Sequence, residues 1–236
     1  MTSIKNQAIA TPDLYPMTNQ ELINDLRQRT EWNLNASRNF LSLTDEQLNR
    51  REVADRWSVL ECLEHLIRYS NFYIPEIGKT IADAPKSFAT LAHTESTPSI
   101  DTSGSKDMKS KKLFSDHQPR FEASDVSKLK FKSGFIGNKM ALSMRPGEEG
   151  TKMKTFKNMN PIGSKLDRRI IDTFIRQQQE TLVLLERCRT VNLSKLKTGI
   201  TLTKFIRLRL GDTLRVVIYH NQRHIEQAER VVENTK

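Results

Sequence analysis

The stretch TLRVVIYHNQRHIEQAERVVEN, residues 213–234, decides how this chain folds. At 100° per residue its apolar side chains fall on one arc, which predicts a long helix with one buried face. His220 lies at the edge of this arc, and His224 lies inside it one helical turn later, so both imidazoles project the same way. Two buried imidazoles are costly unless each finds a partner, and a divalent metal is a partner that neutral imidazole binds well.

Three other stretches of the chain have the same helical periodicity. Thr18 and Ser58 each open a capping box, with a glutamate three residues later, at the start of two of them. Pro75 is expected to kink or break the second helix, and Asp212 is a candidate N-cap of the last one. The fold class is therefore all-α, with four long amphipathic helices at about 18–42, 57–83, 164–190 and 211–233.

The second and third helices are joined by a long segment, residues 93–163, that we interpret as an insertion of uncertain structure. A crossover of this length allows the two helices to lie parallel. Within it, FKSGFIGNKMALSM is compatible with a short helix after a glycine turn. Residues 106–157 hold 13 Lys or Arg against 6 Asp or Glu. This basic stretch is either a solvated surface loop or a phosphate-binding patch.

Length and composition bound the remaining possibilities. The chain of 236 residues suits one domain, 1–236, and its net charge is +10. No apolar run is long enough for a membrane span, and the polar N-terminus lacks the layout of a signal peptide. The two cysteines, Cys62 and Cys188, do not suggest a disulfide framework. We therefore expect a protein of the reducing cytoplasm, with no membrane contact.

An H-x3-H pair is a weak signal on its own, because such pairs also arise by chance on surface helices. A metal site would need a third ligand from elsewhere in the chain. The candidates are His65, His93 and His117. His93 and His117 sit in the polar insertion, where an exposed histidine is expected. His65 lies at the margin of the apolar arc of the second helix. Packed against the last helix, it could complete a face of three histidines.

At these residues the chain resembles the DinB-like (DinB/YfiT) superfamily. The similar segments are WSVLECLEHL at 57–66, LRLGDTLRVVIYHNQRHIEQAERV at 208–231, and FKSGFIGNKMALSM and MKTFKNMNP in the insertion. The resemblance implies a four-helix bundle of up-down-down-up topology, and often a homodimer. It also implies a divalent metal, commonly nickel or zinc, held by His65, His220 and His224 with coordination positions left open. Some members of the family are thiol S-transferases that use a low-molecular-weight thiol, and others are described as metal-dependent hydrolases.

An obvious general base is missing from the sequence. Glu61, one turn before His65, could orient it or reach a water at the metal, but it could equally close the capping box of Ser58. Tyr69, one turn after His65, could line a pocket or pack in the core. We interpret Cys62 as a small buried apolar side chain. The alternatives are a fourth metal ligand or a reactive thiol. Asn221 could hold a histidine in place or satisfy a backbone group.

Three functions are compatible with this reading. The first is a metal-dependent enzyme, of the S-transferase or the hydrolase type, acting on a small molecule. The second is a non-catalytic metal-binding or stress-response module. The third is nucleic-acid binding through Lys106–Lys157, which ranks last because no recognisable motif accompanies the charge.

Overall fold

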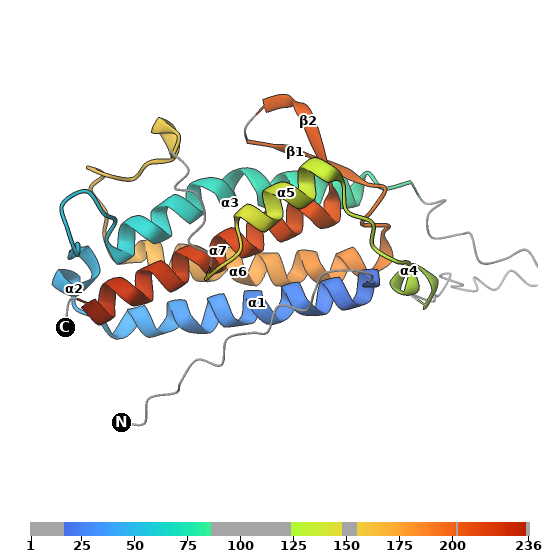
Figure 1. Cartoon of the computed structure of the whole chain (residues 1–236). Helices are drawn as coiled ribbons and strands as arrows, with labels where there is room; N and C mark the ends of the chain where they lie inside the picture. Colours follow the sequence, from blue (N-terminus) through green and yellow to red (C-terminus); the bar gives the residue numbers. More distant parts are fainter. Residues whose placement is uncertain (1–16, 86–123, 148–154, 202, 235–236) are drawn as a thin grey trace, which may run out of the picture.

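The computed structural model describes residues 17–85, 124–147, 155–201 and 203–234. His93, His117 and much of the basic stretch lie outside them. The described chain is mostly helical, with one small antiparallel sheet of two strands (Figure 1). Its long helices are α1 (Asn19–Asn39), α3 (Val59–Ala82), α6 (Arg169–Arg187) and α7 (Leu210–Asn234); the shorter elements are α2 (Asp45–Asn49), α4 (Ser124–Lys128), α5 (Phe135–Ser143), the 3-10 turns η1 (Phe40–Ser42), η3 (Lys157–Met159) and η4 (Cys188–Thr190), and strands β1 (Lys197–Ile200) and β2 (Thr203–Arg209).

The four long helices lie side by side, and α1 and α3 each contact both α6 and α7. In Figure 1, α1 and α7 run from right to left, whereas α3 and α6 run from left to right. The capping boxes predicted at Thr18 and Ser58 are present, so the starts of α1 and α3 are confirmed. Pro75 does not break α3, which is continuous from Val59 to Ala82.

Two predicted helix starts differ from the structure. The third long helix was expected from residue 164, but α6 begins at Arg169, and Asp167 accepts a hydrogen bond from the Arg169 amide at 2.8 Å. Asp212 is not an N-cap, because α7 already begins at Leu210. Its carboxylate instead accepts hydrogen bonds from the Gly134 amide and the Ser133 hydroxyl in the insertion. The Asp212 carboxylate, which the local sequence pattern predicted to cap the helix, therefore forms a tertiary contact instead.

The core consists of two apolar clusters separated by a polar layer across the middle of the helices. Each long helix contributes residues to one cluster on one side of this layer and to the other cluster on the other side. In α7 the layer falls between Tyr219 and Ile225, where the two histidines lie. Such a layer is a poor source of stability, because buried polar groups gain little over their contacts with water. Its buried members are Arg29, Thr30 and Asn33 of α1, Ser70 of α3, Gln177, Gln178 and Thr181 of α6, and Asn221 and Gln222 of α7.

We expect the double variant Asn33→Leu/Gln178→Met to be at least as stable as the wild type. Both side chains are fully buried, and neither amide has a hydrogen-bond partner among the described residues. Replacing such groups by apolar side chains of similar size is neutral or stabilising. Guanidinium unfolding measures the effect. A loss of more than about 2 kcal/mol would contradict the expectation and show that the amides have partners.

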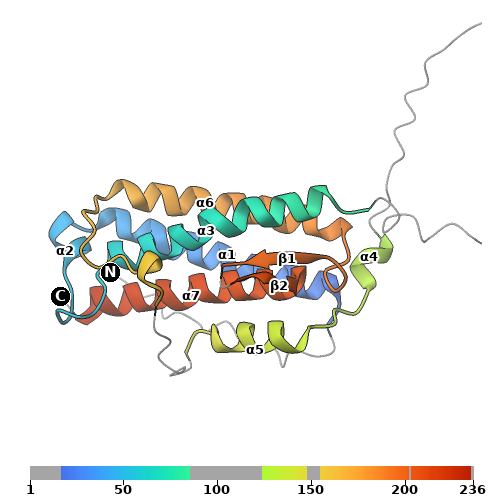
Figure 2. The same ribbon diagram turned by 90° about the horizontal axis from the view of Figure 1, so that it is seen from above.

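The short helix predicted in FKSGFIGNKMALSM is confirmed as α5, which lies alongside α7 (Figure 2). Two glycines allow this close approach. A Cβ at Gly137 would lie 2.6 Å from the Cβ of Asp212, and one at Gly211 would lie 2.3 Å from the ring of Phe131. The Phe131 amide in turn donates to the Met17 carbonyl at 2.9 Å, which ties the segment to the start of α1.

Between α6 and α7 the chain forms the β1–β2 hairpin, which the sequence analysis did not predict. Lys197 pairs with Arg209 and Thr198 with Leu208, and the register shifts between Gly199 and Ile200. The hairpin docks on α3, because the Gly199 amide donates to Glu76 at 2.9 Å. Runs of β-branched residues at 198–208 are the signal that could have indicated it.

Candidate metal centre

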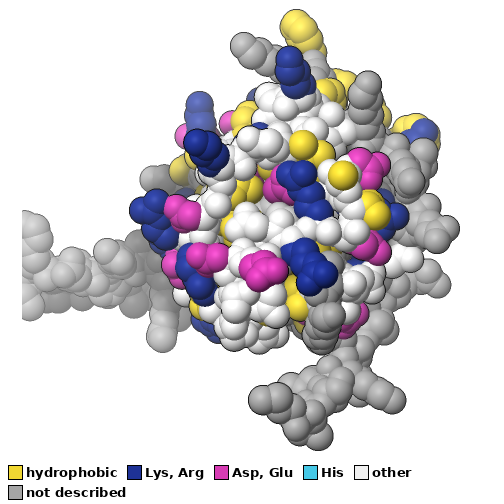
Figure 3. All heavy atoms as spheres, turned by 90° about the vertical axis from the view of Figure 1, so that its left-hand side faces the viewer, with side chains coloured by type: hydrophobic (Ala, Val, Ile, Leu, Met, Phe, Trp, Pro, Cys, Tyr) yellow, Lys and Arg dark blue, Asp and Glu magenta, His cyan; other side chains and the backbone are white. Residues whose placement is uncertain are grey.

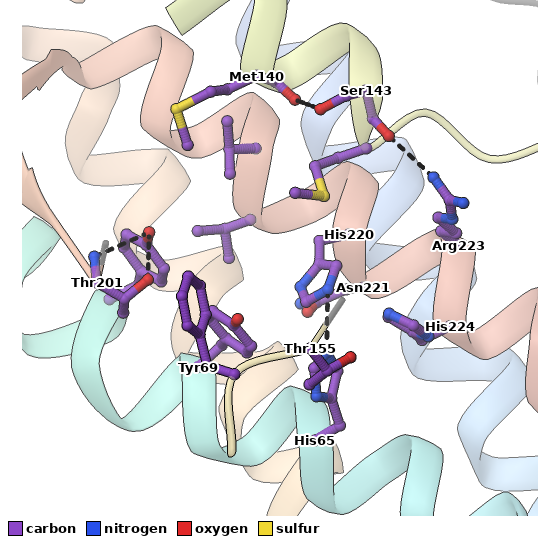
Figure 4. A pocket seen from close by; sticks show the side chains of 15 residues that line it. His65, Tyr69, Met140, Ser143, Thr155, Thr201, His220, Asn221, Arg223 and His224 are labelled. Atoms are coloured by element: carbon purple, nitrogen blue, oxygen red, sulfur yellow. Dashed lines mark hydrogen bonds between the residues drawn. The ribbon is translucent and has the colours of Figure 1, made fainter. Parts of the chain in front are cut away.

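The structure brings three histidines together from two helices. His65 comes from α3, and His220 and His224 come from successive turns of α7. Each offers one ring nitrogen, and these three atoms all lie within 4.8 Å of one another. His65 and His220 point toward each other in Figure 4, with their Nε2 atoms 3.2 Å apart. The grouping expected from the sequence is therefore present.

Hydrogen bonds fix the orientation of two of the imidazoles. The Nδ1 of His65 lies 2.8 Å from the Met159 carbonyl, and the Nδ1 of His224 lies 2.9 Å from Oε1 of Gln227. Both partners are acceptors, so each Nδ1 carries the proton and each Nε2 keeps its lone pair. A metal-binding histidine usually donates its other ring N–H in this way.

Burial keeps these imidazoles uncharged. It lowers the pKa of His65 to about 4 and that of His224 to about 3, and it lowers the pKa of His220 well below its usual value, with the neighbouring histidines adding to the shift. At neutral pH all three rings are therefore neutral, the form that binds a metal. A neutral His220 can donate its Nε2–H to Nε2 of His65 across the 3.2 Å between them, and a shared cation would replace that hydrogen bond. The donor set fits a divalent ion such as zinc or nickel.

Aromatic rings surround the cluster on the α3 side. The Trp57 ring centroid lies 4.5 Å from that of His65 and 5.4 Å from that of His224. The Tyr69 ring meets both His65 and His220 edge-on, with centroids 5.0 Å apart in each case. Trp57 also donates through Nε1 to Asn160 at 3.2 Å, which ties the cluster to the residues before α6.

The two candidate catalytic side chains have different surroundings. Tyr69 lines the pocket beside the histidines, and burial raises the pKa of its hydroxyl. Glu61 closes the capping box of Ser58 and also forms an ion pair with Arg51. Arg51 and the Ser58 amide both lower the pKa of this carboxyl against the effect of burial. A catalytic role for Glu61 or Tyr69 stays a prediction.

We expect Glu61→Ala to destabilise the protein by about 1–3 kcal/mol without changing its metal content. The variant removes a helix cap and a charged hydrogen bond while leaving the three imidazoles in place. Chemical unfolding and metal analysis of the same preparation measure both effects. Glu31→Ala, which removes an exposed pair with Arg27, is the matched control and should cost under about 1 kcal/mol. A loss of metal in the Glu61 variant would instead place the carboxylate at the centre.

Cys62 and Cys188 take no part in the cluster. Both thiols are buried and free. Burial raises the pKa of both, that of Cys188 to about 12, so neither is a thiolate at neutral pH. The interpretation of Cys62 as a small buried side chain agrees with its place in the apolar cluster. Asn221 is buried as well and lines the pocket next to His220.

The histidines lie at one side of a pocket of about 210 Å³ between α3, α7 and α5. Figure 4 shows Met140 and Ser143 of α5 across the pocket from His65 and Tyr69. Sequence reasoning missed these residues and Thr201 of the hairpin, since only tertiary packing places α5 and the hairpin beside the histidines. The pocket leaves room for a small molecule next to the three imidazoles.

A helical protein with three clustered histidines at a pocket is the class that the fold and the site define. The family model described as the DinB superfamily matches residues 29–228. The chain therefore belongs to the DinB superfamily, a metal-binding family. No curated protein and no solved structure matches the chain. Among the helices that the structure describes, none combines the length and the apolar character needed to cross a membrane.

Proposed function

We propose that this protein is a metal-dependent enzyme of the S-transferase or hydrolase type, with His65, His220 and His224 holding zinc or nickel. The observation that supports this most strongly is the approach of three ring nitrogens to within 4.8 Å at the wall of a pocket. Three protein ligands leave coordination positions open, as catalytic sites require. We also propose that residues 1–236 form one DinB-like domain with the up-down-down-up bundle topology. A homodimer stays a prediction.

A divalent metal at this site would lower the pKa of a thiol or a water that binds it, and so supply a nucleophile near neutral pH. The chain's own residues prepare the site for such chemistry. Met159 and Gln227 hold His65 and His224 with their Nε2 atoms presented. Tyr69 is protonated at neutral pH, as tyrosine ordinarily is, and burial raises its pKa further, so its hydroxyl can donate a hydrogen bond to a substrate atom.

Metal analysis of protein purified without a histidine tag, beside the variant His220→Ala/His224→Ala, tests this proposal. We expect about one metal per wild-type chain and none in the variant. No metal in the wild type, even after zinc and nickel are offered, would overturn it. Stoichiometric metal without turnover of any thiol–electrophile or ester substrate would favour the non-catalytic module.

Nucleic-acid binding through Lys106–Lys157 stays a prediction, because much of that stretch lies outside the described residues. Figure 3 shows the end of the bundle that lies at the left of Figure 1. Lys and Arg side chains there alternate with Asp and Glu. Two of the basic residues near this end, Arg56 and Arg168, form ion pairs with Glu52 and Asp45. Paired charges of both signs do not form the one-sign field that attracts a phosphate backbone.

A further inference from the structure

The pocket beside the histidines has mostly apolar walls. They are contributed by several separate parts of the chain, so that a molecule in the pocket would be enclosed on several sides. The walls of α7 and α3 present valine and tyrosine side chains, whereas the opposite wall, the roof of the pocket, has two methionines, whose unbranched side chains adapt to ligands of different shape. The apolar and aromatic lining residues are Val216 and Val217 of α7, Tyr69 and Tyr73 of α3, Met140 of α5, Met144 directly after α5, and Phe156.

Some polar groups of the lining are engaged in hydrogen bonds within the walls, whereas Nδ2 of Asn221 has no hydrogen-bond partner among the described residues. The Ser143 hydroxyl donates to the Met140 carbonyl at 2.8 Å. Arg223 donates to the Ser143 carbonyl at 2.9 Å, near the C-terminal end of α5. At the far side, Thr201 and Tyr73 join their hydroxyls at 3.3 Å. These bonds hold the walls together and leave the Asn221 amide and the Tyr69 hydroxyl as polar groups that a single donor or acceptor atom of a ligand could meet.

Charge is nearly absent from the same walls. Arg223 is the one charged residue among the described lining residues, and no carboxylate accompanies it. A strongly hydrated group that entered the apolar part of this pocket would lose water without finding a partner, which costs several kcal/mol, whereas an anion near Arg223 would find one. An apolar group of the same size would gain free energy by leaving water. The walls therefore discriminate between substrates by their polarity.

We infer that the substrate is a largely apolar small molecule, with one donor atom that faces the histidines and a body that fills the pocket beneath α5. This inference rests on the proposed function, because the donor atom needs the metal. The volume of about 210 Å³ suits such a body, since a dry cavity of about 150 Å³ accommodates benzene. Large hydrophilic thiols match these walls poorly.

Two thiols with similar head groups and different tails test the inference on the cobalt-loaded full chain. The probes are 2-phenylethanethiol and 2-mercaptoethanol, and the readout is the change in the visible and near-ultraviolet spectrum of the cobalt ion. Burial of a phenyl group predicts at least tenfold tighter binding of the phenyl thiol. Equal binding, or tighter binding of 2-mercaptoethanol, would overturn the inference while leaving the metal centre intact.

A pair of variants in α5 connects the preference to the pocket. Met140→Lys places a cation in the roof, and we expect it to reduce the preference for the phenyl thiol at least tenfold. Phe135→Lys makes the same change on a side chain that is 88% exposed and not part of this pocket, and it should leave the preference unchanged. Equal effects of the two variants would contradict the assignment of the pocket. Failure of the wild type to bind cobalt would overturn the proposed function and this inference together.

Discussion

Asp212→Ala should be the most destabilising single substitution considered for this chain, with an expected loss of about 3–5 kcal/mol. Asp212 and Arg215 form an ion pair in which both side chains are buried. The same carboxylate accepts the Gly134 amide at 2.7 Å, and Arg215 donates to Asn138 at 3.0 Å. Removing the carboxylate leaves a buried guanidinium without its counter-charge and releases the segment that leads into α5.

Chemical unfolding of three variants checks this prediction. Asp212→Ala should show the full loss, and the double variant Asp212→Ala/Arg215→Met should recover part of it, since a buried pair replaced as a whole costs less than one broken in half. Glu31→Ala, which breaks the exposed pair with Arg27, is the surface control. A loss below about 1 kcal/mol for Asp212→Ala would show that the pair does not anchor α5.

The same residues show how much of the structure was accessible from the sequence. The four long helices follow from apolar periodicity and capping boxes, which are local signals within one segment. The role of Asp212 was not accessible, because its partners Ser133 and Gly134 lie almost 80 residues away in the chain. The pocket roof depends on that contact, so Met140 and Ser143 could not be assigned to the site in advance.

The candidate site was easier to predict from the sequence than the pocket around it. The spacing of His220 and His224 places both on one helix face, and His65 was the one remaining histidine on an apolar helix margin. The spacing could not predict which groups accept hydrogen bonds from the Nδ1 atoms of His65 and His224. Met159 reaches His65 from the segment before α6, and no pattern in the sequence joins those two positions.

Each of His65→Ala, His220→Ala and His224→Ala should weaken metal binding by more than about 100-fold. Each change removes one of three ligands, whereas loss of an outer hydrogen-bond partner typically costs only about 10–100-fold. Gln227→Ala, which removes the acceptor of the His224 Nδ1–H, is the graded comparison and should fall in that smaller range. Competition with a chelator of known affinity measures all four variants.

Circular dichroism of each variant without metal is the control for folding. His93→Ala and His117→Ala, at the two remaining histidines, should bind metal like the wild type. An unchanged affinity in any one of the three ligand variants would remove that histidine from the site and leave a centre of two ligands.

X-ray absorption at the metal edge of the zinc- or nickel-loaded full chain tests the central claim most directly, because it counts the ligands. The structure predicts three imidazole nitrogens and no sulfur, since Cys62 and Cys188 lie buried away from the cluster. A coordination sphere with fewer than three imidazoles, or with a thiolate, would contradict the assignment of His65, His220 and His224 as the metal centre.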